Sequence, residues 1–284
     1  MFNYNNVMSI VYMCVHIFVT QSFLTTSGNR EYEWTTLVSE KDTYHSTGVK
    51  GLDQLLGNGL LLGENVLLEI ESGTFAREFL YAFIKQGIIE GNQVIYLDFI
   101  YPPQALLMQF DLLTKTLSEN WEKKLLVLDC FSEAAGQGEL IFSDFYDKAP
   151  SWMRKVPSSK DPERFHHFFG RIEREFVTPG TRLVFNSLSL MEHNWGRDAV
   201  KAFFGHVCPA LYAYQTLAYW TMAKNAHPRE FSAMIEHITQ VVIDLSKVEN
   251  KTFIEVKKAG GRYDPQTFQR RAYRVKGLQI DILE

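Results

Sequence analysis

Residues 46–59 read STGVKGLDQLLGNG, and this stretch gives the strongest indication of the fold of the chain. Glycines at this density permit tight turns and positive φ angles, and the paired leucines supply a packing face. An apolar run follows at 66–70, and then residues 71–80 read ESGTFAREFL and lead into a helical pattern. A strand, a loop and a helix in that order form the place where nucleotide-binding α/β proteins cradle phosphate. Yet this loop contains a single glycine and no lysine.

From residue 46 onward, short β-rich runs alternate with longer helical ones. This alternation predicts an α/β domain with a mostly parallel central sheet flanked by helices. The strands expected in that sheet are 65–70, 93–99, 125–131, 182–187, 216–222 and 240–245. Short runs at 252–257, 272–275 and 278–282 predict an antiparallel extension at the C-terminal end. No linker divides the pattern, so we expect one domain over 46–284, preceded by an N-terminal extension over 1–45.

Two helices are indicated by apolar residues at helical spacing, and both apolar stripes are expected to face the core. The residues are Leu106, Phe110, Leu113 and Leu117 in the first helix and Phe165, Phe168, Ile172 and Phe176 in the second. Asp161-Pro162 precedes the second set, and such a pair is typical of an N-cap and first turn. Residues 136–159 have no clear pattern, so we expect a long excursion there.

The motif at 46–59 strongly resembles the segment that leads into the first strand in the KaiC-like branch of the RecA-type ATPases, a superfamily that includes the RadA paralogues. The resemblance continues through 94–99, 183–188 and 239–260 and is weakest over 132–178. It implies a RecA-like P-loop NTPase fold, whose mostly parallel sheet would carry the antiparallel C-terminal extension. It also implies an oligomer, because RecA-type domains commonly assemble side by side with nucleotide between neighbours.

Compared with the phosphate loop of that family, the loop of this chain has lost most of its chemistry. In the family, glycines turn backbone N–H groups toward phosphate, a lysine binds the β- and γ-phosphates, and a hydroxyl holds Mg²⁺. The replacements here are Ile70 and Phe75 for glycines, Ala76 for the lysine and Arg77 for the hydroxyl residue, with Gly73 retained. Loss of one charge-assisted contact alone costs about 1.5–3 kcal/mol.

Two further functions of an ATPase site are missing by the same comparison. Asn186 stands where an acidic residue would steady Mg²⁺. Ile100-Tyr101 stand where paired glutamates would position and deprotonate the attacking water. The resemblance therefore implies a degenerate site without a catalytic residue, which binds ATP or ADP weakly or not at all. The residues left for such binding are Ser72, Gly73, Thr74, Arg77 and Asn186.

We therefore expect a cytoplasmic, catalytically degenerate subunit with a regulatory or scaffold role that depends on protein–protein contacts. The expected interface contains Phe75 and a turn with Lys257, Lys258 and Arg262, which in relatives reaches the neighbouring subunit. The expected partner is a second copy of the chain or another RecA-like ATPase subunit. Three alternatives stay open: an ATPase or kinase that binds nucleotide at an unorthodox site, a DNA-associated recombination accessory protein, and an RNA-linked scaffold like the P-loop-less RecA-like subunits of the Elongator complex.

Other candidate sites carry weaker signals. His166-His167 and Glu163 share a predicted helix, but adjacent histidines point to different sides, so we expect no metal site. Ser187 and Ser189 lie outside a GxSxG turn, and the sequence places no His or Asp partner beside them, which argues against a hydrolase.

The charge composition gives no general attraction for nucleic acid, since the net charge is -4. A local basic cluster is either a solvated face or a contact for phosphates or a partner; it consists of Arg262, Arg270, Arg271, Arg274 and Lys276. The three cysteines are widely spaced and form no CxxC pair, which favours a reducing, intracellular compartment over a disulfide framework.

Residues 1–29 contain no Asp, Glu, Lys or Arg. Within them, 7–19 is apolar enough for the core of a signal peptide, but it is too short to span a bilayer and lacks a basic leader. We therefore expect no membrane anchor. The native protein is expected to start near Leu37 or Val38, or to tolerate loss of this segment.

Overall fold

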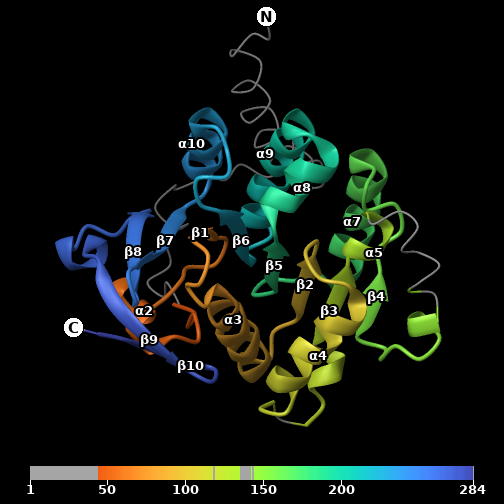
Figure 1. The fold of residues 1–284 in the computed structure, drawn as a ribbon, viewed down its shortest axis with the longest axis horizontal. Helices are drawn as coiled ribbons and strands as arrows, with labels where there is room; N and C mark the ends of the chain where they lie inside the picture. The colour runs from red at the N-terminus through yellow and green to blue at the C-terminus, as the bar shows by residue number, and fades with distance from the viewer. Residues whose placement is uncertain (1–43, 118, 135–141, 143, 284) are drawn as a thin grey trace, which may run out of the picture. The chain divides into compact units, whose positions relative to one another are not determined.

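The computed structural model describes residues 44–117, 119–134, 142 and 144–283, and residues 43–284 form one compact unit. The predicted extension over 1–45 therefore lies almost wholly outside the described residues. Within the unit, the strands form one sheet in the order β10-β9-β8-β7-β1-β6-β5-β2-β3-β4 (Figure 1). The strands are β1 Asn65–Ile70, β2 Val94–Asp98, β3 Leu125–Asp129, β4 Met153–Lys155, β5 Arg182–Asn186, β6 Leu217–Ala223, β7 Val241–Val248, β8 Lys251–Ala259, β9 Arg271–Lys276 and β10 Gln279–Ile282.

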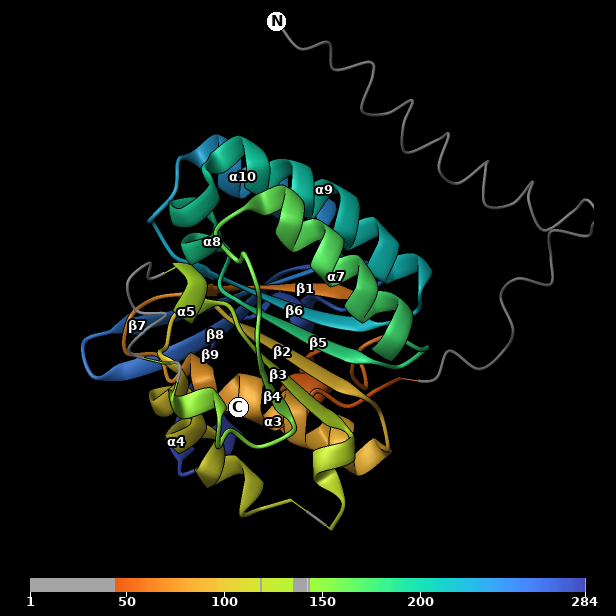
Figure 2. The same ribbon diagram turned by 90° about the vertical axis from the view of Figure 1, so that its right-hand side faces the viewer.

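Helices cover both faces of this sheet (Figure 2). The described helices are α2 Lys50–Leu55, α3 Ala76–Glu90, α4 Pro103–Thr114, α5 Phe131–Ala134, α7 Pro162–Phe176, α8 Leu188–Trp195, α9 Arg197–Ala213 and α10 Arg229–Ile238, with short 3₁₀ turns η2 Trp121–Lys123 and η3 Pro265–Phe268. Figure 2 shows α3 and α4 on one face and α7, α8, α9 and α10 on the other. The layers are therefore helix, sheet, helix, which confirms the predicted α/β class.

The sheet is parallel from β7 to β4 and antiparallel over its last strands. β1 pairs in parallel with both β6 and β7, and β2 pairs in parallel with β3 and β5. β8, β9 and β10 continue the sheet in antiparallel pairs, as the sequence predicts. Strands buried on both faces need near-continuous apolar runs, which the sequences NVLLEI, VIYLD, LLVLD and RLVFN nearly supply. The carboxyl ends of the parallel strands consequently meet at one edge.

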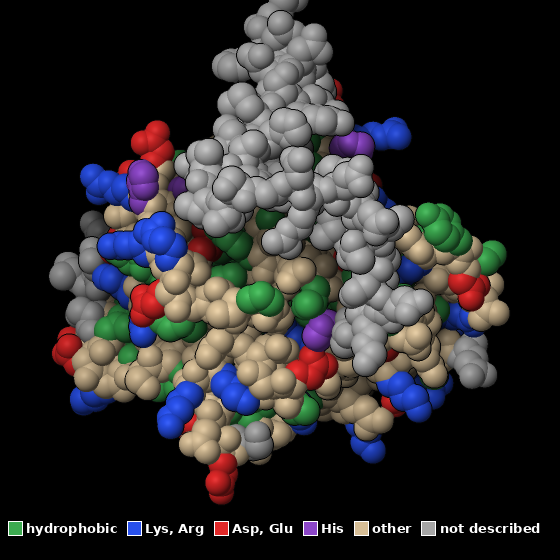
Figure 3. Space-filling model, turned by 180° about the vertical axis from the view of Figure 1, so that it is seen from behind, with side chains coloured by type: hydrophobic (Ala, Val, Ile, Leu, Met, Phe, Trp, Pro, Cys, Tyr) green, Lys and Arg blue, Asp and Glu red, His purple; other side chains and the backbone are tan. Residues whose placement is uncertain are grey.

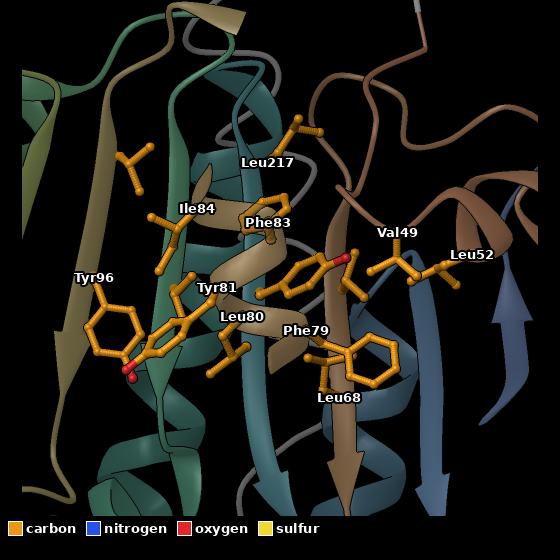
Figure 4. Close-up of a cluster of buried hydrophobic side chains, with 14 of the residues drawn as sticks. Val49, Leu52, Leu68, Phe79, Leu80, Tyr81, Phe83, Ile84, Tyr96 and Leu217 are labelled. Carbon is orange, nitrogen blue, oxygen red and sulfur yellow. The ribbon is translucent and has the colours of Figure 1, made fainter. Parts of the chain in front are cut away.

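Helix α3 forms the centre of one core layer. Figure 4 shows its side chains Phe79, Leu80, Phe83 and Ile84 directed toward the strands beneath the helix. The Phe83 ring stacks on Tyr219 of β6 with the ring centroids 4.0 Å apart. Both aromatic residues are almost fully buried. This packing fixes the start of α3, and therefore the loop before it, relative to β1.

The motif at 46–59 is held by its own polar side chains and packs against α3 at Gly48. The Asp53 carboxylate accepts hydrogen bonds from the Ser46 hydroxyl at 2.5 Å and from the Thr47 amide at 2.7 Å. Gly48 has a φ of +83°, and a Cβ there would lie 2.2 Å from the Ala82 carbonyl oxygen. A larger residue cannot fit without moving α3, so the glycine of the motif is a packing requirement.

Arg182 connects three parts of the unit from a fully buried position on β5. Its guanidinium donates to the Ser46 carbonyl at 2.8 Å, to the Phe83 carbonyl at 3.2 Å and to the Glu90 carboxylate at 2.7 Å. The guanidinium carbon also lies 4.7 Å from the centroid of the Phe83 ring. The motif segment, α3 and β5 therefore share one cation.

Two details depart from the sequence predictions. β4 lies within 136–159, where an excursion without a strand is expected, and its MRK sequence is too short and polar to be recognised. In α7, Phe165 and Ile172 are buried and Phe176 is partly buried as predicted, but Phe169 is buried in place of Phe168, which is only partly buried. The predicted N-cap is confirmed, since the Asp161 side chain accepts from the amides of Glu163 and Arg164.

The surface of the described residues carries both signs of charge. Figure 3 shows basic and acidic side chains interspersed over the face seen from behind. No helix within the described ranges is both long enough and apolar enough to cross a bilayer. The apolar stretch 7–19 lies outside those ranges.

Candidate functional site

The loop between β1 and α3 lies at the carboxyl edge of the sheet, where a phosphate-binding loop would lie. Thr74 donates its hydroxyl to the Glu71 carbonyl at 2.7 Å, so this hydroxyl closes the turn. The Tyr273 hydroxyl of β9 donates to the Thr74 carbonyl. Gly73 has a φ of +81°, and Ser72 and Gly73 are both exposed. Three of the predicted site residues are thus brought together in one ordered turn.

Phe75 occupies the position directly before α3 with an unusual backbone. Its φ and ψ of 55° and 37° are left-handed, and its side chain offers no acceptor to the helix start. The residue is 54% exposed, so the aromatic ring is not held there by burial. A bulky side chain in this conformation costs roughly 1–2 kcal/mol that glycine would not cost.

Arg77 directs its charge along α3. Its guanidinium pairs with the Glu78 carboxylate at 2.9 Å and lies 5.9 Å from the centroid of the Tyr81 ring. Partial burial would lower the pKa of Arg77, but the hydrogen bond and charge of Glu78 raise it above its ordinary value. Arg77 is therefore a cation with a local partner, at the outer rim of the loop.

Lys247 is a cation beside the loop that sequence reasoning missed. Its backbone amide donates to the Glu71 carboxylate at 3.0 Å. A Cβ built on Gly73 would lie 3.5 Å from the Lys247 Nζ atom. The residue lies near the end of β7, which neighbours β1 in the sheet but follows it by most of the chain. The sequence alone gives no sign of this proximity.

Asn186 ends β5 and is fully engaged in a buried network. Its side-chain amide donates to the Tyr96 hydroxyl at 2.9 Å and to the Asp98 carboxylate at 2.8 Å. Its side-chain oxygen accepts from the Thr221 hydroxyl at 2.9 Å. The hydrogen-bonding capacity that a Mg²⁺-supporting residue would offer outward is thus used within the sheet.

Asp98 is a second residue that sequence reasoning missed. It ends β2, and its carboxylate accepts from the Ile100 amide at 2.8 Å and the Tyr101 amide at 2.7 Å. Burial raises the pKa of Asp98 to about 6, although the hydrogen bonds to Tyr101, Asn186, Ile100 and Tyr96 act in the opposite direction. The signal was available as an aspartate that closes the run VIYLD. This carboxylate shapes the turn at 100–101 and lies beside Asn186.

The predicted interface turn has partners within the chain. Lys257 pairs with Glu69 at 2.6 Å and with Asp244 at 3.1 Å. Lys258 donates to carbonyls at the end of α10, including that of Thr239 at 2.6 Å. Arg262 pairs with Glu64 at 2.5 Å and donates to the Leu56 carbonyl at 2.7 Å. Lys257 and Lys258 thus lie on β8 and not in the predicted turn, and they contact β1, β7 and the end of α10. Arg262 follows β8 and contacts the motif segment, while Phe75 lies at the loop before α3.

The weaker candidates are placed as follows. His166 packs against His206 of α9 with ring centroids 5.0 Å apart. In the described part of the chain, no group of three or more His, Cys, Asp or Glu side chains could hold a metal ion. Ser187 caps α8, while Ser189 lies 2.7 Å from a ring nitrogen of His227. Sequence analysis places no His partner beside Ser189, whereas the structure places His227 there.

Comparison with solved structures identifies the architecture. The crystal structure of a KaiC-like protein from the hyperthermophilic archaeon Pyrococcus horikoshii matches with a TM-score of 0.62, covering 86% of this chain and 100% of that chain. The chain has a RecA-like fold. Because the sequence identity is 17%, this similarity shows the fold and does not show a shared activity.

Two comparisons of the sequence add to the structural comparison. A family model described as PAXNEB protein matches residues 38–125, which include the motif, the loop and α3 of the RecA-like fold. No curated protein sequence matches the chain significantly.

Proposed function

We propose that the chain is a catalytically degenerate RecA-like subunit with a regulatory or scaffold role that depends on protein–protein contacts in the cytoplasm. Phe75 carries the proposal. A half-exposed aromatic ring in a left-handed conformation is unfavourable in an isolated subunit, and a partner that covers the ring would offset the cost.

The chemistry of the loop supports the loss of catalysis. Ala76 supplies no cation to a phosphate, and the Thr74 hydroxyl closes its own turn. Asn186 has no charge to offer a metal, and its amide is engaged with Tyr96 and Asp98. A site that lacks the phosphate clamp and the metal support lacks the electrostatic stabilisation that phosphoryl transfer requires.

The interface that we propose includes Phe75 and the rim formed by Arg77. Lys257 and Lys258 on β8 and Arg262 after it would take part by fixing the shape of this segment, because their charged groups already have partners. A second copy of the chain or another RecA-like ATPase subunit is the proposed partner.

Replacement of Phe75 tests this proposal. We expect Phe75→Ser to weaken self-association, or co-purification with a RecA-like ATPase, at least tenfold, as measured by size-exclusion chromatography with light scattering. Tyr212→Ser is the matched control, since Tyr212 is also 54% exposed but lies on α9. A monomer that binds no RecA-like ATPase and is indifferent to Phe75→Ser would refute the scaffold role.

Lys247 favours one alternative, namely a site that binds nucleotide without hydrolysing it. Its ammonium group lies beside Gly73, where its charge would replace that of the missing lysine. Titration with ATP, with and without Mg²⁺, tests this alternative. Binding that Lys247→Met reduces at least tenfold would support this alternative. Absence of binding at millimolar ATP would contradict it and would leave the scaffold role as the remaining proposal.

A further inference from the structure

Ser189, His227 and Glu192 form a hydrogen-bonded chain at the carboxyl edge of the sheet. The Ser189 Oγ atom lies 2.7 Å from His227 Nε2. The other ring nitrogen, Nδ1, contacts the Glu192 carboxylate. The second oxygen of that carboxylate accepts from Arg197 Nε at 2.7 Å. Hydroxyl, imidazole and carboxylate thus follow one another in the order of a serine-hydrolase triad.

The fold explains why these side chains meet. Ser189 lies in the first turn of α8, directly after β5, and Glu192 lies one turn later on the same helix. His227 lies between β6 and α10, and β6 is the parallel neighbour of β5. The carboxyl ends of β5 and β6 therefore lie side by side. A position just after a parallel strand is also where open α/β sheets commonly bind ligands.

The hydrogen bonds assign a role to each atom. Because a carboxylate only accepts, His227 Nδ1 carries the proton and Nε2 is free to accept the Ser189 proton. Partial burial would raise the pKa of Glu192, but hydrogen bonds from Arg197 and His227 lower it, so its carboxylate stays charged. The Ala223 amide donates to Ser189 Oγ at 2.9 Å, which stabilises that oxygen as it loses its proton.

The environment combines a shielded base with an accessible nucleophile. The His227 side chain is 3% exposed, and its ring lies 5.1 Å from that of Phe231. Ser189 is half-buried, and the adjacent Ala223 is exposed. In the first turn of α8 the Leu190 amide donates to the Ser187 hydroxyl and the Met191 amide to the Ser187 carbonyl, so an oxyanion would be bound by the amides of Leu188 and Ser189.

We propose that Ser189, His227 and Glu192 hydrolyse carboxylic esters. Ser189 Oγ bonds to the carbonyl carbon while its proton moves to His227 Nε2. The bond from carbon to the leaving oxygen then breaks, and His227 returns the proton to the departing alcohol. Water repeats the sequence on the acyl-serine: its oxygen bonds to the carbonyl carbon, its proton passes through His227 to Ser189, and a carboxylic acid leaves. Ester and water thus give acid and alcohol.

A fluorophosphonate probe tests the nucleophile on the full-length protein. Ser189 Oγ would displace fluoride, and peptide mass spectrometry would find the adduct on Ser189. We expect labelling of the folded protein, at least tenfold less labelling in His227→Gln, and none after heat denaturation. Absence of an adduct on Ser189 in the folded wild-type protein would overturn the proposal, and this result does not depend on any variant folding.

Hydrolysis of p-nitrophenyl acetate tests turnover. We expect Ser189→Ala to lower the rate at least tenfold and Ser232→Ala, a serine on α10 outside the triad, to leave it unchanged. Glu192→Gln should lower kcat while leaving KM within twofold, and should shift the pH–rate profile, since the glutamate acts by orienting His227. Wild-type rates in Ser189→Ala, or an unshifted profile in Glu192→Gln, would reduce the three residues to a structural link between α8 and the segment before α10.

Discussion

Arg182 and Asp98 are two buried charged groups that differ in the partners around them. Arg182 has a carboxylate and two carbonyls around it, so its cation is compensated even though burial lowers its pKa. Asp98 accepts hydrogen bonds from neutral groups, namely two backbone amides, the Tyr96 hydroxyl and the Asn186 side chain. Burial raises the pKa of Asp98, and the hydrogen bonds from these neutral donors offset this effect only in part.

Loss of the Arg182 charge should be costly. Arg182→Met removes the hydrogen-bond donor of the Ser46 and Phe83 carbonyls and the cation that pairs with Glu90. We expect the free energy of unfolding to fall by about 3 kcal/mol. Urea denaturation measures the change. Arg164→Met is the control, since Arg164 is largely exposed and lies 3.5 Å from Asp161, so its loss should cost at most about 0.5 kcal/mol. Equal effects of the two substitutions would contradict the role of burial.

Asp98 predicts a specific pH dependence. Its pKa rises from 3.8 in the unfolded chain to about 6 in the folded chain, so the folded state binds the proton more tightly. The stabilisation by this proton is complete below pH 3.8 and is lost as the pH rises through 6. Relative to Asp98→Asn, the wild type should therefore lose on the order of 3 kcal/mol across that window.

Urea denaturation at several pH values measures this difference. Asp111→Asn, at an exposed position on α4, should follow the wild-type profile throughout. A constant difference between wild type and Asp98→Asn from pH 4 to pH 7 would show that Asp98 has an ordinary pKa.

The start of α3 shows how a helix can be held in place although the residue directly before it has a strained backbone. Phe75 is left-handed and half-exposed, whereas Phe79, one turn later, is buried and packs edge-on against Tyr273. The helix is held by its buried face, so the residue at its start can adopt an unfavourable conformation.

Phe75→Gly should therefore behave unlike an ordinary large-to-small substitution. Relief of the left-handed strain offsets the greater flexibility of glycine, and we expect the free energy of unfolding to stay the same or rise by up to about 1 kcal/mol. Phe79→Ala on the same helix should lower it by about 3–5 kcal/mol. Thermal and urea denaturation measure both, and a loss above about 1 kcal/mol in Phe75→Gly would show that the ring is supporting the fold.

The elements differ in how well the sequence predicts them, for physical reasons. Apolar runs such as NVLLEI predict buried parallel strands, and Asp161-Pro162 predicts the start of α7, because each pattern is local. β4 was missed because its MRK sequence has no apolar alternation and its pairing with β3 is non-local. Lys247 and His227 could not be assigned to sites, since each meets its neighbour only when the sheet order is known.

At the scale of the whole molecule, catalysis of ATP hydrolysis would need several distant parts at once. The phosphate clamp would come from the loop before α3, the metal support from the end of β5, and the water-activating carboxylates from the turn after β2. If all three parts are degenerate, as we propose, restoring one of them should not restore the others.

Purified protein should therefore show no ATP turnover above background, and Ala76→Lys should not create any. Phe75 and Asn186 remain in this variant, so the loop is still obstructed and the metal still unsupported. A coupled ATPase assay with Mg²⁺ measures both proteins. Wild-type turnover that disappears in Arg77→Ala would make Arg77 a replacement cation and contradict the degenerate reading.

The position of β1 has a consequence for synthesis on the ribosome. β1 ends at Ile70, but its two neighbours begin only at Leu217 and Val241. During translation this apolar strand emerges early and has no neighbour until β2, β3, β4 and β5 have also been made, whereas β2 and β3 can pair much sooner. Such delayed pairing is slow and exposes the nascent chain to aggregation. A ribosome stalled before residue 217 would therefore carry a sheet that lacks its central strand.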